Sequence, residues 1–373
     1  MDRARRDIMI VTLILALIGV VMVYSSTSII SARAYGSSFN YILKHIFTML
    51  ISIMGMLLIS RLDYQNLKRL SIILLVTSFV MLLLVFIPGI GVSINGARRW
   101  INLGLTNFQP SEFVKLSMVV FLSDYMSKNL NRMNELKYGI MIPLCVMIVF
   151  QVLFILQPDF GGVVNMGILT LSMLFIGGAK LRYLLSIILS SIPVMAALIV
   201  FFPYRLKRVT CFLDPWQDPQ GCGFQLVQSF IAFGRGHVFG VGIGNSKQKL
   251  SYLPEAYTDF IFSLIGEELG LIGVMVVIGL FIWLITRGLS IAKRADAPFG
   301  YYLSMGLTIM IGVQTIVNFF VATGLMPTKG LPLPFVSYGG SALLVNMLAV
   351  GILMNIAEDN MKRGLVGEIE RLR

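Results

Sequence analysis

Asp259 is the residue best placed to do chemistry, because it stands where a long polar segment gives way to an apolar run. The polar segment covers residues 203–257 and carries many charged and aromatic side chains, whereas most of the chain around it is apolar. A carboxylate at this boundary could take a proton from the hydroxyl group of a substrate whose tail lies in lipid. The competing interpretation is structural, because Thr258 and Asp259 form a good N-terminal pair for the helix that the apolar run predicts.

Basic residues near the same boundary could hold the phosphate groups of such a substrate. They are Arg98 and Arg99 before Trp100, Arg205 and Arg208 at the start of the polar segment, and Lys329 in a stretch rich in proline and glycine. Arginine in particular matches phosphate in a two-pronged geometry. For any single one of them, an interfacial anchor at a helix end is the competing interpretation.

The stretch from Leu331 to Ser341 cannot form a regular helix, because its prolines lack the N–H donor that a helix needs. Irregular backbone at membrane depth must line a cavity or pack against protein. We therefore count Ser337, Gly339 and Gly340 as candidates for substrate binding, since backbone N–H groups at the start of a helix attract anions. Packing between helices is the alternative.

Five further ionisable residues are expected to support the site. Glu112 and Lys115 share one helix face, as a structural ion pair or a functional pair. Glu267 lies about 12 Å along the helix from Asp259, and either it or its neighbour is expected to pair with Lys115. Asp159 follows a proline at a helix start and is expected to cap that helix. Glu255 belongs to the last motif of the polar segment.

Two patterns resemble functional motifs without their context. The glycines at positions 240, 242 and 244 resemble a dinucleotide-binding loop, but no strand precedes them, and a flexible turn is expected. The two histidines are too separate to form a zinc site with cysteine. Cys145 is expected to pack within an apolar run. Cys211 and Cys222 either form a disulfide or remain two thiols.

The composition indicates an all-α polytopic membrane protein. Of 373 residues, 57% are hydrophobic and 13% are charged, and the mean hydropathy is +0.84. A soluble domain carries about twice that charged fraction. Ten apolar runs predict ten transmembrane helices: 8–28, 41–60, 70–88, 111–127, 138–156, 160–179, 182–202, 258–286, 299–323 and 341–358. We treat residues 1–373 as a single membrane domain, with residues 203–257 as one long loop between the seventh and eighth helices.

The lysines and arginines predict the orientation of this bundle. With the N-terminus inside, the inner segments hold 18 of the 30 basic residues, and the outer segments hold 10, six of which lie in the long loop. This bias places both termini in the cytoplasm and the long loop outside. The net charge of +12 is therefore attributed to residues that orient the helices in the membrane and that attract an acidic leaflet. Binding to nucleic acid is excluded.

The polar motifs resemble those of the SEDS family of bacterial membrane proteins (FtsW/RodA-type peptidoglycan glycosyltransferases), and within it the cell-division branch. The resemblance covers nearly the whole chain. It is carried by Gly-Ala-Arg-Arg-Trp-Ile at 96–101, Phe-Gln-Pro-Ser-Glu at 108–112, Gln-Pro-Asp-Phe-Gly at 157–161, Tyr-Leu-Pro-Glu-Ala at 252–256, Thr-Asp-Phe-Ile-Phe at 258–262, Gly-Glu-Glu-Leu-Gly at 266–270 and Pro-Phe-Val-Ser-Tyr-Gly-Gly-Ser at 334–341.

The resemblance implies an enzyme that polymerises lipid II at the outer face of the cytoplasmic membrane, at the division septum. Asp259 matches the proposed catalytic aspartate, as a general base, with undecaprenyl pyrophosphate as the leaving group. The implied partners are a class B penicillin-binding protein (FtsI-type) and other division proteins of the membrane. The family also allows a divalent cation, Mg²⁺ or Mn²⁺, held by Asp259. Tyr257 departs from the pattern, which usually has histidine there. A lipid II flippase and a non-catalytic scaffold are the alternative functions.

Overall fold

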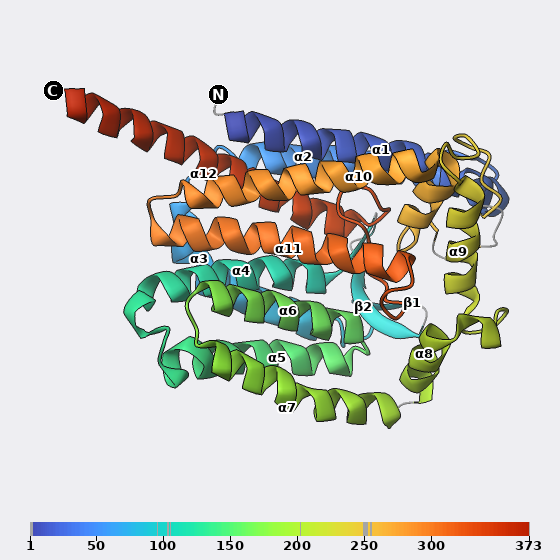
Figure 1. The fold of residues 1–373 in the computed structure, drawn as a ribbon, viewed down its shortest axis with the longest axis horizontal. Helices are drawn as coiled ribbons and strands as arrows, with labels where there is room; N and C mark the ends of the chain where they lie inside the picture. Colours follow the sequence, from blue (N-terminus) through green and yellow to red (C-terminus); the bar gives the residue numbers. More distant parts are fainter. Residues whose placement is uncertain are drawn as a thin grey trace.

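The computed structural model describes residues 3–94, 96–102, 104, 106–201, 203–248, 253 and 256–372. Long helices run side by side with both termini at one end, and short helices and a small sheet gather at the other (Figure 1). The helices are α1 (Arg3–Tyr35), α2 (Asn40–Ile59), α3 (Gln65–Leu84), α4 (Pro110–Lys128), α5 (Ile142–Leu156), α6 (Phe160–Ile176), α7 (Leu181–Val200), α8 (Pro203–Leu213), α9 (Phe224–Gly236), α10 (Ile261–Lys293), α11 (Pro298–Ala322) and α12 (Gly340–Leu372).

Each of the ten apolar runs coincides with a helix. Among the described residues, eight helices are long and apolar enough to cross a membrane, and α6 is a shorter apolar helix. Helix α4 carries four ionisable side chains, Glu112, Lys115, Asp124 and Lys128, which lower its hydropathy. The class of polytopic helical membrane protein is confirmed, and the total of ten spans stays a prediction.

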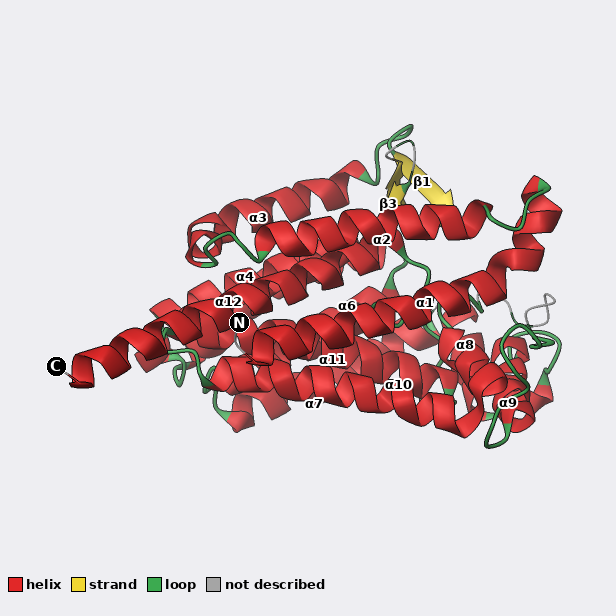
Figure 2. Cartoon of the chain, turned by 90° about the horizontal axis from the view of Figure 1, so that it is seen from above, coloured by secondary structure: helices red, strands yellow, loops and turns green. Residues whose placement is uncertain are grey.

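A three-stranded antiparallel sheet follows α3 and was not predicted. Its strands β1 (Gly91–Ile94), β2 (Ala97–Asn102) and β3 (Asn107–Phe108) pair in the order β1–β2–β3. The sheet lies at the end opposite the termini, where Figure 2 shows it above the bundle. It brings Arg98 and Arg99 to the end of the molecule where the long polar segment also lies.

The buried core lies among α1, α4, α10, α11 and α12. In their most apolar stretches, 67% of the residues of α11 and 78% of those of α12 are buried, against 6% for α7. Helix α7 therefore presents most of its leucine and isoleucine side chains outward, as a helix in lipid does. Cys145, on α5, is exposed on such a surface, so the expectation that it packs in the interior is wrong.

The long polar segment is partly helical. Helices α8 and α9 and a short 3-10 helix (Pro215–Gln217) occupy it, and a disulfide joins Cys211 to Cys222 across the turn between the two helices. The disulfide decides between the two alternatives that the spacing of these cysteines left open. The segment is thus a helical unit, cross-linked by a disulfide, at one end of the bundle.

Helix α10 is broken at Gly270, whose φ of 67° and ψ of −164° are not helical. Residues 237–242, which we call the wedge segment, lie against the break. Val241 and Gly242 donate their N–H groups to the carbonyls of Glu267 and Glu268, and Leu271 and Ile272 donate theirs to the carbonyls of His237 and Val238. The wedge segment thereby satisfies the helix groups that the break exposes.

The glycines of the wedge segment are therefore not a flexible turn. Gly240 and Gly242 have φ values of +78° and +92°, which favour glycine. A Cβ added to Gly240 would lie 2.2 Å from the carbonyl oxygen of Glu268. Only glycine allows the two backbones to approach so closely, so the sequence expectation of a flexible turn is wrong.

Candidate active site

Asp259 lies in a turn of residues 256–260, which we call the Asp259 turn, immediately before α10. The helix begins at Ile261, its N-cap residue is Phe260, and no side chain caps it. The competing interpretation placed the cap of this helix at Thr258 and Asp259, whereas the N-cap position is Phe260. Asp259 is half-buried, and its carboxylate lies against Gly330, since a Cβ on that glycine would be 3.0 Å from Oδ2.

The connection between α11 and α12, residues 323–339, forms the other side of the site. We call it the proline-rich connection. Ser337 donates a hydrogen bond to the carbonyl of Thr258 and accepts one from the N–H of Leu333 at 2.8 Å. The N–H of Tyr338 donates to the carbonyl of Tyr257 at 2.8 Å. These bonds fix the connection against the Asp259 turn.

A cluster of opposite charges stands beside this connection. Arg99 donates to the carbonyls of Gln157 and Pro158, and its guanidinium lies 3.6 Å from Asp159. Asp159 caps α6 by accepting from the N–H of Gly162 at 3.1 Å, as the sequence predicted. Arg99 is thus tied to the N-terminus of α6, and it fixes the sheet to the bundle.

Lys329 is the most perturbed basic group near Asp259. Burial lowers its pKa to about 8, and the negative charge of Asp159 opposes that shift. Lys329 directly precedes Gly330, against which the Asp259 carboxylate lies. A partly desolvated ammonium group suits the binding of a phosphate, because its positive charge acts more strongly where water is excluded.

The other predicted phosphate ligands are less closely grouped. Arg208 donates to the carbonyl of Thr328 at 3.3 Å, which brings α8 to the proline-rich connection. Arg98 is exposed on β2, and it points away from Arg99 because neighbouring strand residues alternate. Arg205 lies in α8, but its side chain is outside the described residues, as is the whole of Glu255.

Ser337, Gly339 and Gly340 lie where the proline-rich connection enters α12. Ser337 is 3% exposed, and its hydroxyl is used in the two internal bonds described above, which favours a positioning role over substrate contact. Gly339 accepts the N–H of Leu343 into its carbonyl, and Gly340 packs against Thr48 of α2. The first turn of α12 therefore lies between α2 and the connection.

The supporting charges pair as expected at Glu112 and Lys115 but not at Glu267. Lys115 contacts Glu112 at 2.8 Å and donates to Oε1 of Gln314 at 2.9 Å, so the structural ion pair is confirmed. Glu267 is fully buried and contacts Arg235 of α9 at 3.0 Å. Its carboxylate also accepts from Ser246 and from the backbone N–H groups of residues 247 and 248. The expectation that Glu267 or Glu268 pairs with Lys115 is wrong, because Glu267 faces α9 and Glu268 accepts a hydrogen bond from Ser25 of α1 at 2.5 Å.

Sequence reasoning missed two features of the site. Asn318 of α11 donates to the carbonyls of Asp259 and Leu331, at 2.9 and 2.8 Å. Tyr257 packs with Tyr41 and Tyr338, with ring centroids 5.9 and 5.8 Å away. A polar amide inside an apolar helix was the signal for Asn318. The tyrosine cluster places an aromatic wall where the family pattern has histidine.

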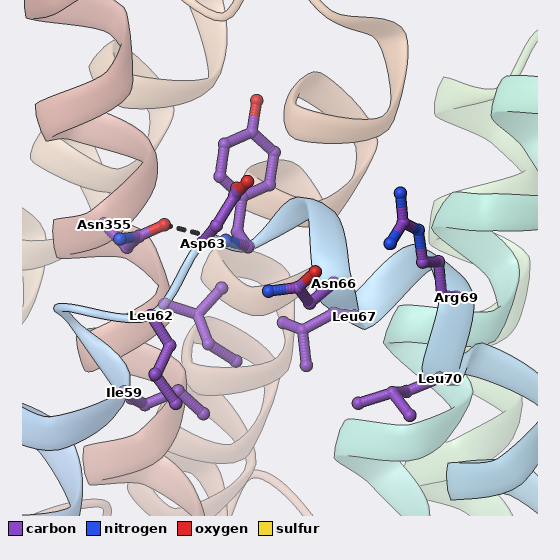
Figure 3. Close-up of a pocket in the computed structure, with 10 residues that line it drawn as sticks. Ile59, Leu62, Asp63, Asn66, Leu67, Arg69, Leu70 and Asn355 are labelled. Atoms are coloured by element: carbon purple, nitrogen blue, oxygen red, sulfur yellow. Dashed lines mark hydrogen bonds between the residues drawn. The ribbon is translucent and has the colours of Figure 1, made fainter.

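A cavity of about 520 Å³ lies elsewhere, near the end of the bundle that carries the termini (Figure 3). It is lined by Asp63, Arg69 and Asn355 among apolar side chains, and Asn355 accepts the N–H of Tyr64. Asn355 is about 22 Å along α12 from Gly340 at 1.5 Å per residue. We therefore do not assign the chemistry of Asp259 to this cavity.

The resemblance gives Asp259 as the carboxylate that would hold a divalent cation. The described residues contain no group of three or more His, Cys, Asp or Glu side chains that could hold a metal. Mg²⁺ commonly binds through one or two carboxylates together with water and substrate phosphates. Asp259 fits that smaller role.

The chain is similar to known proteins along nearly its whole length. It matches the family model described as cell cycle protein (FtsW, RodA, SpoVE) over residues 5–362. It is 43% identical over 356 residues to the probable peptidoglycan glycosyltransferase FtsW of Trichlorobacter lovleyi, covering 95% of this chain and 93% of that protein. It is 41% identical over 354 residues to the same-named protein of Legionella pneumophila, covering 94% and 90%.

Solved structures share the fold. One chain, solved in work on "structural coordination of polymerization and crosslinking by a peptidoglycan synthase complex", superposes with a TM-score of 0.77 at 27% identity, covering 95% of this chain and 97% of that one. The rod shape determining protein RodA of Thermus thermophilus gives a TM-score of 0.70 at 24% identity, covering 95% and 96%. Because the family model matches residues 5–362 and the relatives match over nearly their full lengths, the chain belongs to the FtsW/RodA/SpoVE family of cell cycle proteins, the SEDS family.

Proposed function

We propose that this protein is a peptidoglycan glycosyltransferase that polymerises lipid II at the outer face of the bacterial cytoplasmic membrane during cell division. One observation carries the proposal. The Asp259 carboxylate lies against Gly330 of the proline-rich connection, and the same connection carries the desolvated amine of Lys329, at the end of the bundle opposite the termini. The names of the relatives, probable peptidoglycan glycosyltransferase FtsW, support the reaction class.

The reaction follows from the roles that these groups can take. Asp259 removes the proton from the acceptor sugar's hydroxyl, and that oxygen attacks the anomeric carbon of the donor. The bond from that carbon to the undecaprenyl pyrophosphate breaks, and the pyrophosphate leaves with the electron pair, so the configuration inverts. One carboxylate suffices because pyrophosphate is already a good leaving group, whereas hydrolysis of an ordinary glycoside uses two.

The positive groups act on the departing pyrophosphate. Lys329 belongs to the proline-rich connection, and Arg208 donates a hydrogen bond to it. Negative charge that develops on the phosphate oxygens would be stabilised there. Arg98 and Arg205 remain candidates for contacts further along the lipid-linked headgroup. A bound Mg²⁺ or Mn²⁺ would be held by Asp259 together with phosphate oxygens, and it would supply further neutralisation of charge.

The membrane orientation and the partner belong to the same proposal. The distribution of basic residues supports cytoplasmic termini and an outer site. A structural neighbour comes from a peptidoglycan synthase complex, which supports a class B penicillin-binding protein as the partner at the division septum. Penicillin binding would reside in that partner.

Polymerisation of purified lipid II tests the proposal. The protein is purified with its class B penicillin-binding partner, and glycan chains are resolved by gel for wild type, Asp259→Ala and Asp259→Asn. We expect polymer from wild type and none from either variant, at equal yield of folded protein. Asp214→Asn is the matched control, because Asp214 is an exposed carboxylate of the same outer segment and should be dispensable.

Two outcomes would overturn the assignment. Full activity in Asp259→Asn, which keeps the shape of the side chain but cannot accept the proton, would remove the base role. Movement of fluorescent lipid II across vesicle bilayers, with no polymer formed by the wild type, would replace the enzyme with a flippase.

A further inference from the structure

Two buried amide side chains of α11 point at the proline-rich connection. Gln314 and Asn318 lie one helical turn apart and are at most 1% exposed. Gln314 donates to the carbonyl of Pro332 at 2.9 Å. Asn318 uses both hydrogens of its amide nitrogen, one on the carbonyl of Leu331 at 2.8 Å and one on that of Asp259 at 2.9 Å.

The connection needs donors from outside itself. Pro332 and Pro334 have no N–H group, so this backbone cannot pair with itself as a helix or strand does. A buried carbonyl without a partner costs free energy. The amides of α11 supply the missing donors, and Asn318 supplies one to each of two segments that are far apart in the sequence.

The orientation of Asn318 is fixed by its partners. If the amide were reversed, its oxygen would face the carbonyl oxygens of Asp259 and Leu331, and three acceptors would repel one another. Among the described residues, Oδ1 of Asn318 has no hydrogen-bond partner that competes for this choice. The fork of N–H groups therefore sets the separation between the Asp259 turn and the connection that carries Lys329.

We propose that Asn318 is a positioning residue for the transferase reaction, holding the backbone of Asp259 at a fixed distance from the connection that carries Lys329. This inference rests on the proposed function. Asn318 touches neither substrate nor the Asp259 carboxylate in this role. It acts through the main chain, so that the base and the phosphate-binding amine keep one relative geometry while lipid-linked sugars enter and leave.

A second amide distinguishes positioning from general packing. Gln314 is as deeply buried as Asn318, but it contacts the connection alone and has no bond to the Asp259 turn. Its own orientation is held by Lys115, which donates to Oε1. If Asn318 acts by positioning Asp259, loss of its donors must disturb catalysis more than loss of the Gln314 donor does.

The test uses Asn318→Leu, because leucine has the same branched shape but no donors, with Asn318→Ala beside it in case one of the two fails to fold. Asn346→Leu is the matched control, since Asn346 is equally buried but donates only to Ala342 within its own helix. Each protein is assayed with its partner on lipid II for kcat and KM. Hydrogen exchange of residues 256–262 is measured by mass spectrometry on the same samples.

We expect kcat of the folded Asn318 variant to fall about 100-fold, the cost of displacing a catalytic group by about 1 Å, with little change in KM. Exchange at residues 256–262 should rise at least about tenfold, as for a locally opened segment. The Asn346 control should retain wild-type values, and Gln314→Met should lie between the two.

Wild-type kcat together with unchanged exchange at residues 256–262 in the folded Asn318 variant would overturn the inference. So would an equal loss in Asn346→Leu, which would show a general cost of burying leucine there. Failure of the proposed function is recognised separately. If wild type forms no polymer, or Asp259→Asn forms as much as wild type, the exchange measurement still decides whether Asn318 positions the turn.

Discussion

Gly240 of the wedge segment offers the sharpest test of the fold around Asp259. Replacement by alanine would place a Cβ 2.2 Å from the carbonyl oxygen of Glu268, at a residue with φ of +78°. Left-handed backbone alone costs a non-glycine residue about 1–2 kcal/mol. The clash must also separate the wedge segment from α10.

The size of the effect follows from the bonds at stake. Val241 and Gly242 each donate to an α10 carbonyl at 3.0 Å. Loss of the partner of one buried carbonyl costs about 1–3 kcal/mol. With the backbone term, we expect Gly240→Ala to lower the free energy of unfolding by about 2–5 kcal/mol.

Two glycines provide matched controls. Gly89 has φ of +89° but would meet nothing within 4 Å, so Gly89→Ala should cost only the backbone term, about 1–2 kcal/mol. Gly234, inside α9, also has open space around it, and Gly234→Ala should stabilise that helix by up to about 1 kcal/mol.

Unfolding of the detergent-solubilised variants by increasing sodium dodecyl sulfate, followed by circular dichroism, measures these differences. Hydrogen exchange of residues 261–272 reports whether the break itself is disturbed. An equal loss of stability in Gly240→Ala and Gly89→Ala would refute the reasoning, because it would leave only the backbone term and no close contact with α10.

Three further predictions concern charged groups. Because burial lowers the pKa of Lys329 to about 8, its charge is present at pH 7 and is lost as the pH rises through 8; KM for lipid II should therefore increase between pH 7 and 9, and Lys329→Arg should abolish that increase. Glu267→Gln weakens the contact with Arg235 and should destabilise the outer segment by about 2 kcal/mol, seen as faster proteolysis between α9 and α10, whereas unchanged cleavage would contradict it. Lys115→Met leaves Glu112 buried without its partner and should cost about 3–5 kcal/mol in detergent unfolding, and Glu112→Gln in the same chain should restore most of the loss.

The transmembrane helices were predictable because a run of apolar residues of spanning length has few alternatives in lipid. All ten runs coincide with helices. The small sheet after α3 was not predictable, since strands of four, six and two residues carry almost no periodic signal and depend on their pairing. Helices α8 and α9 had an amphipathic signal, but the abundance of charge in residues 203–257 favoured reading them as loop.

Features of the candidate site that depend on residues close in the sequence were predictable. Contacts between residues far apart in the sequence were not. Asp159 as a helix cap and Glu112 with Lys115 as an ion pair follow from local spacing, and both are confirmed. The partner of Glu267 depends on which way α10 faces, and the prediction of a pairing with Lys115 was wrong. The contact of Asn318 with Asp259 joins residues 59 positions apart, so an isolated amide in an apolar helix was its only trace.

The break in α10 has a consequence for how the protein is made. The wedge segment is synthesised before α10, yet four of its backbone hydrogen bonds form only when α10 arrives. In turn, a nascent α10 that entered the bilayer already interrupted at Gly270 would expose polar backbone to hydrocarbon. We infer that α10 enters the membrane as an uninterrupted rod and bends only when the folded outer segment seats against it, so that the catalytic end of the bundle is the last part to mature.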